Sequence, residues 1–180
     1  VVLFRSAARW DVRYIDMLES IDDEKPLLTT YPPHFTIGDD GTISYDRDAG
    51  VQVLYVDEVT DDLTTLQKTD VLHDLSVPGR SPTLAAGQIF TRGSFCSEVP
   101  YDPEIYFAGE EISLAARAFT HGYDLYCPNE NLIWHLYGHD RPRHWDDHDD
   151  HRDAHSATAE RLNHLFCGPP DALGEYGLGR

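Results

Sequence analysis

The chain has 180 residues and is 41% hydrophobic, which suits one globular domain with a single sizeable core. Its formal net charge of −18 argues against nucleic acid or an anionic membrane surface as a partner. No apolar run approaches the roughly 18 to 20 residues that a membrane-spanning helix needs. An anionic diphosphate could bind so acidic a protein only if a cation or a locally basic pocket offset the negative field.

The first half of the chain predicts a short helix and several strands. The helix spans residues 10–21, where Tyr14, Ile15, Leu18 and Ile21 lie on one side. Strands are expected at residues 1–4, 27–31, 42–45 and 51–56. The polar stretch from 57 to 82 predicts loop with short extended pieces.

The second half carries the clearest periodic pattern. Residues 84–91 predict a strand of small residues with Gly87 in its middle, a position typical of a bulge or a close approach by a ligand. A helix is expected over residues 109–121, and Gly122 ends it. The remaining expected elements are strands at 123–127 and 132–136 and a last helix at about 149–166. Strands and helices alternate, so we expect an α/β class and one domain over residues 1–180.

Glu110 and Glu111 begin the 109–121 helix and are the first candidates for chemistry. The partial positive charge at a helix N-terminus favours carboxylates by about 0.3 to 1 kcal/mol, so a structural role alone could explain the pair. Adjacent helical residues point roughly 100° apart. One of the two side chains could therefore face a cleft while the other caps the helix or meets solvent.

His135 lies in an apolar strand, residues 132–136. A lone histidine in such a strand is more often a hydrogen-bonded core residue than a metal ligand. Its neutral imidazole is nevertheless a suitable ligand for Mn²⁺-type ions beside carboxylates from elsewhere in the chain.

Five ordered blocks of the sequence resemble the cytoplasmic GlcNAc-transferases that modify hydroxyproline in eukaryotes, and their bacterial relatives. The blocks are residues 85–90, 98–103, 107–112, 122–126 and 134–137. Trp10-Asp11 and residues 28–32 fit the same family, so the likeness covers nearly the whole chain. More distantly, Ala86-Gly87, residues 109–111 and His135 are similar to the corresponding blocks of polypeptide GalNAc-transferases.

The resemblance implies a GT-A-like mixed sheet flanked by helices and a retaining transfer of a sugar, with GlcNAc favoured, from a UDP-sugar to an acceptor hydroxyl. It implies Mn²⁺ or Mg²⁺ as the cofactor, with His135 as a ligand. Glu110 matches the carboxylate that contacts the donor sugar, and Glu111 would shape the donor or acceptor pocket. Further donor-binding positions implied by the resemblance are Ala86, Gly87, Gly109 and Tyr137. The arginine that often follows the metal histidine in the family is missing here, and Arg141 or Arg143 is expected to replace it in a contact to the diphosphate. The acceptor is a protein, a peptide or a small glycan.

The same family places an Asp-x-Asp or Asp-x-His metal motif just before the segment that ends in Trp10-Asp11. We therefore expect this motif and the nucleotide-binding portion of the fold to precede Val1. The family usually continues past a segment like Tyr176–Gly179, so we expect the domain to extend beyond this end as well.

Residues 144–155 contain His144, His148, His151 and His155 at helical spacing, interleaved with aspartates. Two of these histidines and a carboxylate could bind Zn²⁺ or another transition metal, and a metal-dependent hydrolase centred here is one alternative. A solvated acidic helix whose histidines pair with aspartates is the simpler interpretation. A non-catalytic carbohydrate-binding fragment is the other alternative for the whole chain.

The three cysteines, Cys96, Cys127 and Cys167, are odd in number and widely spaced. They predict free, buried thiols in a reducing compartment, and hence a cytoplasmic location.

Overall fold

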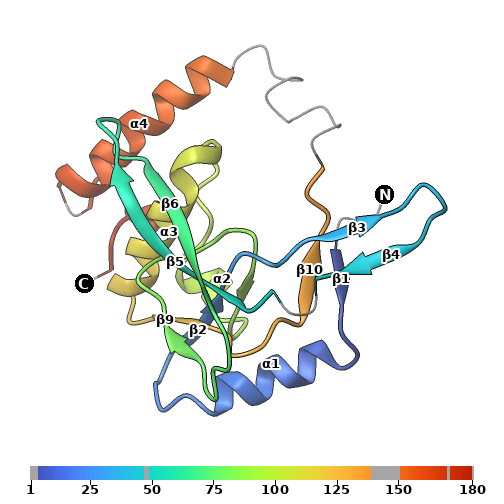
Figure 1. The fold of residues 1–180 in the computed structure, drawn as a ribbon. Coiled ribbons are helices and arrows are strands. Elements are labelled where there is room, and N and C mark those ends of the chain that lie inside the picture. Colours follow the sequence, from blue (N-terminus) through green and yellow to red (C-terminus); the bar gives the residue numbers. More distant parts are fainter. Residues whose placement is uncertain (1–3, 47–48, 139–150, 170, 180) are drawn as a thin grey trace.

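The computed structural model describes residues 4–46, 49–138, 151–169 and 171–179, which form a mixed α/β fold (Figure 1). Its α-helices are α1 (Trp10–Glu19), α2 (Phe95–Glu98), α3 (Glu110–Thr120) and α4 (His151–Cys167). Short 3-10 turns are η1 (Phe107–Gly109) and η3 (Gly174–Tyr176). The strands are β1 (Phe4–Ser6), β2 (Pro26–Thr29), β3 (Phe35–Ile37), β4 (Ile43–Tyr45), β5 (Val51–Val59), β6 (Thr65–Leu72), β7 (Gly79–Arg80), β8 (Ile89–Phe90), β9 (Asp124–Cys127) and β10 (Ile133–His135). The predicted α/β class is confirmed.

The central sheet has the strand order β7-β9-β2-β8. Its middle pair, β2 and β9, is parallel, and the outer pairs are antiparallel. Leu27 of β2 packs in one core cluster with Leu114 of α3, and Leu28 packs in another with Tyr14 of α1. Because successive residues of a strand point to opposite faces, α3 and α1 cover the two faces of this sheet. All of β2 is buried between them, as its apolar sequence predicts.

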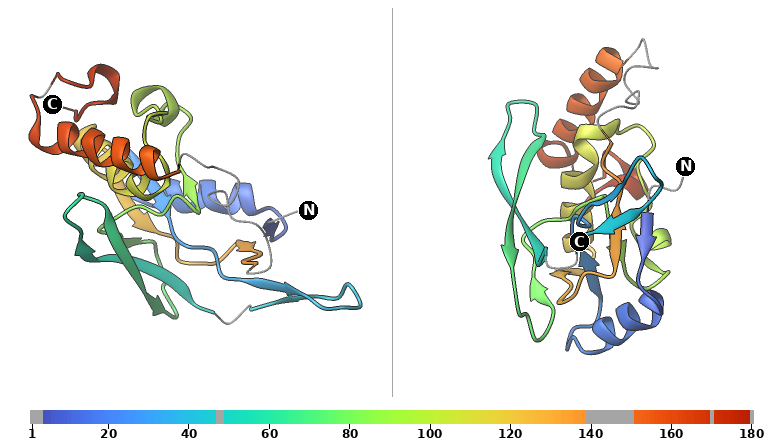
Figure 2. Two further views of the ribbon diagram at one scale, coloured as in Figure 1. Left: turned by 90° about the horizontal axis from the view of Figure 1, so that it is seen from above. Right: turned by 45° about the vertical axis from the view of Figure 1, so that its right-hand side comes forward.

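Smaller two-stranded sheets are formed by β1 with β10, β3 with β4, and β5 with β6. In Figure 2 the β3–β4 and β5–β6 hairpins extend outward from the central sheet. The β5–β6 pairing runs from Val51 opposite Leu72 to Val59 opposite Thr65. The prediction of loop over residues 57–82 is therefore wrong at β6. Polar residues dominate this strand, and backbone pairing with β5 holds it rather than burial of an apolar face.

The predicted strand over residues 84–91 is also wrong for most of its length, since only β8 pairs in the sheet. Residues Ala86 and Gly87 form a turn instead. The backbone N–H of Ala85 donates to Thr29 Oγ1 over 2.8 Å, and that of Ala86 donates to Glu111 Oε1 over 2.9 Å. Side chains distant in sequence thus satisfy the backbone donors that a strand would have paired, and they fix this turn at the edge of the sheet.

Helix α4 is attached to the segment before η1 by a buried ion pair. Arg161 Nε donates to Asp102 Oδ2 over 2.9 Å, and Nη2 donates to Oδ1 over 3.3 Å. The Asp102 side chain is 2% exposed and that of Arg161 is 20% exposed. Nearby, an added Cβ on Gly109 would lie 2.7 Å from Thr158 Cγ2 of α4, so only glycine permits this close approach.

Replacing Arg161 by alanine is expected to lower the free energy of unfolding by about 2 kcal/mol, because it leaves the Asp102 carboxylate buried without its cation. The partial exposure of Arg161 places this loss below the roughly 3 to 5 kcal/mol of fully buried pairs. Urea unfolding measures the change. Arg13→Ala, which breaks the exposed pair between Arg13 and Glu130, is the control and should cost less than about 1 kcal/mol. Equal losses in the two variants would contradict the attachment of α4 through Asp102.

The three cysteines are free. Cys127 is buried, and its burial raises the pKa of its thiol. Cys96 and Cys167 are exposed, so the prediction of buried thiols is wrong for these two. They lie on α2 and at the end of α4. None of the helices in the described ranges is both long and apolar enough to cross a bilayer.

Candidate functional site

A cavity of about 730 Å³ lies where the turn of residues 86–87 meets the start of α3 and the β1–β10 pair. Its lining comes from several elements distant in sequence: Phe4, Tyr31, Pro32, Thr64, Thr65, Leu66, Ala86, Gly87, Phe107, Glu110, Glu111, His135 and Tyr137. The structure thus brings together Ala86, Gly87, both glutamates, His135 and Tyr137, all of which the sequence had singled out. A cavity of this size is typical of small-molecule sites.

Glu111 is held by three donors at once. Its Oε1 accepts from the Ala86 N–H over 2.9 Å, and its Oε2 accepts from Gln67 Nε2 over 2.9 Å. The Tyr31 hydroxyl lies 2.9 and 3.0 Å from the two oxygens. Burial raises the pKa of the Glu111 carboxyl above its ordinary value, and the hydrogen bonds from Ala86 and Tyr31 partly oppose the rise. Glu111 therefore ties the turn at Ala86, β6 and the segment after β2 to the start of α3.

Glu110 is placed differently from its neighbour. Its Oε2 accepts a hydrogen bond from the Tyr101 hydroxyl, and no described residue donates to its Oε1. Burial and the adjacent Glu110 carboxylate raise the pKa of Tyr101, so its hydroxyl stays protonated and able to donate. Of the two glutamates, Glu110 keeps the greater free capacity to accept a hydrogen bond from a ligand in the cavity.

His135 ends β10 beside the antiparallel β1, where it lies opposite Phe4. Its ring centroid is 4.7 Å from that of Phe4 and 4.2 Å from that of Tyr137. Its Nδ1 is buried and has no hydrogen-bond partner among the described residues. Burial lowers the pKa of His135, which keeps the imidazole neutral near pH 7. A neutral imidazole is a suitable ligand for one position in a metal coordination shell.

Tyr137 and the turn at Gly87 complete the wall. The Tyr137 hydroxyl donates to the Pro32 carbonyl over 2.9 Å, which fixes the ring against His135. At Gly87 an added Cβ would lie 3.3 Å from the Tyr31 ring, so a side chain would crowd this wall.

Two predicted donor-binding residues do not join this group. Gly109 is buried beneath α4 and does not line the cavity. Its role in this structure is to let α4 pack closely against the start of α3, and not to contact a ligand. Arg141 lies outside the described residues, as does most of the histidine-rich segment 144–155. Its last residue, His155, is described: its Nε2 lies 2.9 Å from Asp62 Oδ2 in the β5–β6 turn. His155 is thus paired with an aspartate from a distant part of the chain.

No cluster of three or more His, Cys, Asp or Glu side chains suited to a metal is found in the part of the chain that the structure describes. His135 accordingly stands as a single candidate ligand.

A second cavity of about 520 Å³ adjoins the first and shares Phe4, Ala86 and Gly87 with it. Arg5 and Trp10 line its other side. The sequence predictions named no site residue for this cavity beyond those it shares. The sequence could not predict it, because β1 has only three residues and shows no periodic pattern that would mark Arg5 or Ser6 as a site residue.

The raised pKa of Glu111 predicts a pH-dependent difference in stability between the protein and its Glu111→Gln variant. The folded chain binds a proton at this carboxyl more tightly than the unfolded chain does. The stabilisation from this proton is complete below the ordinary value of 4.5 and is lost as the pH rises through the raised pKa. Thermal unfolding of both proteins should therefore show the wild type losing stability relative to the variant as the pH rises above 4.5. A difference in Tm that stays constant with pH would contradict the raised pKa.

A family model described as Glycosyltransferase (GlcNAc) matches residues 3–170 of the chain. The matched region contains every residue that lines the two adjoining cavities. No curated protein matches the chain.

Proposed function

The chain belongs to the GlcNAc glycosyltransferase family, and on this premise we propose that it moves a sugar, GlcNAc by preference, from a UDP-sugar to an acceptor hydroxyl. The proposal includes a GT-A-like arrangement, retention of configuration and dependence on Mn²⁺ or Mg²⁺. It places the chain near the hydroxyproline-type members of the family, with polypeptide GalNAc-transferases as distant relatives. It also takes residues 1–180 as part of one catalytic domain that works in the cytoplasm.

The observation that carries the proposal is the larger cavity together with its neighbour. A transferase must hold two substrates against each other, and two adjoining cavities with a shared wall at Phe4, Ala86 and Gly87 suit that need. The larger one contains the carboxylates and the histidine, so we assign the donor sugar to it. The smaller one is then available to the acceptor.

Glu110 is the residue we assign to the donor sugar. Its Oε1 has no donor among the described residues, so a sugar hydroxyl can bond there. Positive charge develops on the sugar ring as the bond to the diphosphate breaks, and an anionic carboxylate in a cavity stabilises that charge. Glu111 has both oxygens engaged and serves as a positioning residue for the turn at Ala86.

His135 is the residue we assign to the cation, because its neutral ring lines the donor cavity. The bound cation would supply electrostatic stabilisation of the leaving diphosphate. This answers the difficulty raised by a net charge of −18, which otherwise repels an anionic donor. The remaining ligands would come from outside the described residues.

The bases on the described walls are the two glutamates and His135, and His135 is assigned to the cation. We propose front-face attack, with an oxygen of the departing UDP taking the acceptor proton. No covalent sugar–enzyme intermediate is required.

The test is release of UDP by the full-length protein from UDP-GlcNAc, with UDP-glucose, UDP-galactose and UDP-GalNAc as alternatives. We expect release that requires Mn²⁺ or Mg²⁺, stops on addition of EDTA and is fastest with UDP-GlcNAc. Absence of release from all four donors with either metal would instead favour a non-catalytic carbohydrate-binding protein. Zinc binding that disappears when His144, His148 and His151 are replaced would support the hydrolase alternative.

A further inference from the structure

Two strand edges border the smaller of the two adjoining cavities, here called the acceptor cavity. Among the described strands, β8 lies at one end of the central sheet and pairs with β2, and β1 pairs with β10. All three residues of β1 and the consecutive residues 88–90, which contain β8, line this cavity. Side chains on one face would contribute only every second residue. The cavity therefore meets both strands at their edges.

The side chains of β8 agree with an edge-on contact. Ile89 packs against the core cluster that contains Leu114 of α3, and Phe90 packs against the cluster that contains Tyr14 of α1. These clusters lie on opposite faces of the central sheet, yet both residues line the acceptor cavity. The cavity thus spans the edge of β8 that faces away from β2, where a strand directs the N–H and C=O groups that its partner does not use.

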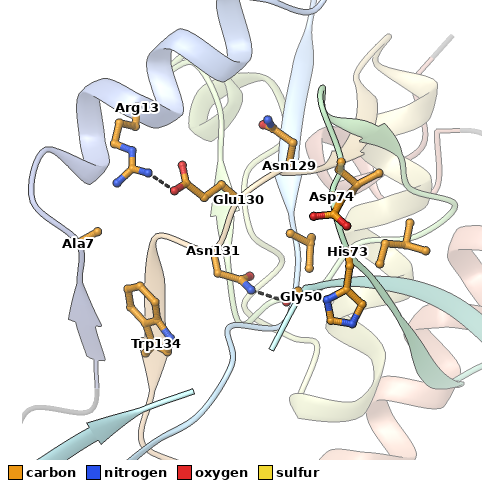
Figure 3. A pocket seen from close by; sticks show the side chains of 12 residues that line it. Ala7, Arg13, Gly50, His73, Asp74, Asn129, Glu130, Asn131 and Trp134 are labelled. Carbon is orange, nitrogen blue, oxygen red and sulfur yellow. Dashed lines mark hydrogen bonds and ion pairs between the residues drawn. The ribbon is translucent and has the colours of Figure 1, made fainter. Parts of the chain in front are cut away.

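Arg5 shows the same for β1. It lies opposite Trp134, and its guanidinium carbon is 5.4 Å from the centroid of the Phe35 ring. Residues directly opposite each other in an antiparallel pair share a face. Trp134 lines a different cavity, of about 490 Å³, which Figure 3 shows. The Arg5 side chain therefore lies on the Trp134 side of the strand, and the Arg5 backbone borders the acceptor cavity.

The hydrogen bonds of β1 direct the backbone groups of Ser6 to this edge. In an antiparallel pair, alternate residues point their N–H and C=O groups away from the partner strand. The Ala7 N–H donates to the Leu132 carbonyl over 2.8 Å, so Ala7 points toward the β10 side and Ser6 points away from it. The Ser6 side chain is exposed, and no described residue bonds to its N–H or C=O.

The dimensions of the acceptor cavity suit a short extended segment. Three strand residues span roughly 10 Å, which a peptide of about three or four residues matches. Trp10 and Ile133 add apolar surface. Strand edges offer N–H and C=O groups at the spacing of a peptide backbone, which favours a peptide over a saccharide. The wall shared at Phe4 brings one residue of such a segment next to the donor cavity.

We propose that the acceptor is an extended peptide segment, which binds between β1 and β8 as an added β-strand. Its main chain bonds to the N–H and C=O of Ser6 on one side and to the free edge of β8 on the other. A hydroxyl-bearing side chain points past Phe4 to the donor cavity. The name of the acceptor cavity rests on the proposed function, whereas binding of the peptide requires neither metal nor transfer.

The test uses a blocked seven-residue peptide of alternating valine and threonine with a lysine at each end, added to the full chain without donor or metal. Valine and threonine favour extended backbone, and the lysines complement the net charge of −18. Binding is followed by NMR through the Ser6 amide and the Trp10 indole N–H, and we expect both resonances to shift. N-methylation of each of the three central peptide bonds in turn should weaken binding about tenfold, because the N–H groups of an inserted strand alternate between its two neighbours.

Two variants of Ser6 isolate the backbone donor. Ser6→Pro removes the N–H and should weaken binding of the peptide about tenfold. Ser6→Ala keeps the N–H and removes only the hydroxyl, so it is the matched control and should bind like the wild type. Equal Tm values in the two variants would show that β1 still pairs with β10. If Ser6→Pro lowers Tm, the N-methylated peptides carry the test on the wild type alone.

Three results would overturn the proposal. The first is that the peptide shifts neither the Ser6 nor the Trp10 resonance. The second is that all N-methylated peptides bind as tightly as the parent peptide. The third is that cellobiose shifts both resonances while the peptide does not, which would make the cavity a glycan site. Failure of the proposed function looks different, since the peptide would still bind while no donor released UDP.

Discussion

Replacing His135 by alanine is expected to lower metal-dependent release of UDP by more than about 100-fold. Loss of residues that merely support a metal ligand already costs about 10- to 100-fold, and His135 is assigned as a ligand itself. Burial lowers the pKa of His135 from its ordinary value of 6.5, so the ring is neutral and able to bind a metal at pH 7. The measurement is the rate of UDP release as a function of Mn²⁺ concentration, together with direct Mn²⁺ binding followed by electron paramagnetic resonance.

The His135→Phe variant separates a metal role from a packing role. The ring of His135 packs against Phe4 and Tyr137, and phenylalanine can keep these contacts but cannot bind a metal. We expect His135→Phe to fold like the wild type and to be as inactive as His135→Ala. Recovery of activity in His135→Phe would show that the ring matters only for packing. His121→Ala is the control outside the cavity: its ring bonds to the Arg117 carbonyl at the end of α3, and activity should be nearly unchanged.

The helix α3 shows how far the sequence alone can be used. Its apolar residues repeat with helical spacing, and the predicted span of 109–121 differs from the observed Glu110–Thr120 by one residue at each end. Gly122 has a φ of +83°, the left-handed conformation expected of a glycine that ends a helix. Local periodicity and a terminating glycine are sufficient here, because both act within a few residues.

The turn at Ala86 and Gly87 could not be predicted in the same way. Its small apolar residues are compatible with a strand, and the decisive contacts come from Thr29 and Glu111, which are 56 and 25 residues away. Strand β6 was missed for a related reason, since its pairing with β5 determines its conformation and its own sequence is polar. The conformation of both segments is therefore determined by contacts with distant parts of the chain.

The sequence predicted some of the residues that line the candidate cavity, but not the hydrogen bonds that distinguish Glu110 from Glu111. The ordered blocks of sequence named Glu110, Glu111 and His135, and the fold brings them to one cavity. Which glutamate faces a ligand depends on hydrogen bonds from Tyr31, Gln67 and the turn, all supplied by tertiary structure.

The division of roles between the two glutamates leads to the second large expected effect. Glu110→Gln should lower kcat by about 100- to 1000-fold, the range seen when one electrostatic contact to a transition state is removed. Glutamine keeps the size of the side chain and an oxygen for hydrogen bonding. It removes the negative charge that stabilises the positively charged sugar in the transition state. Because Tyr101 is the one described donor to Glu110, Tm should change little.

Glu111→Gln is the matched comparison, since it makes the same chemical change one residue along α3. Both oxygens of the Glu111 carboxylate accept hydrogen bonds. In the glutamine variant an N–H₂ group replaces one oxygen, and facing the Nε2 of Gln67 it would bring two donors together with no acceptor. The resulting disturbance acts through the turn at Ala86, so we expect a raised KM for the donor with a smaller effect on kcat. The two variants therefore separate into a kcat effect and a KM effect when both are measured with UDP-GlcNAc. A large fall in kcat at unchanged KM in Glu111→Gln, with Glu110→Gln nearly normal, would reverse the assignment and make Glu111 the residue that contacts the sugar.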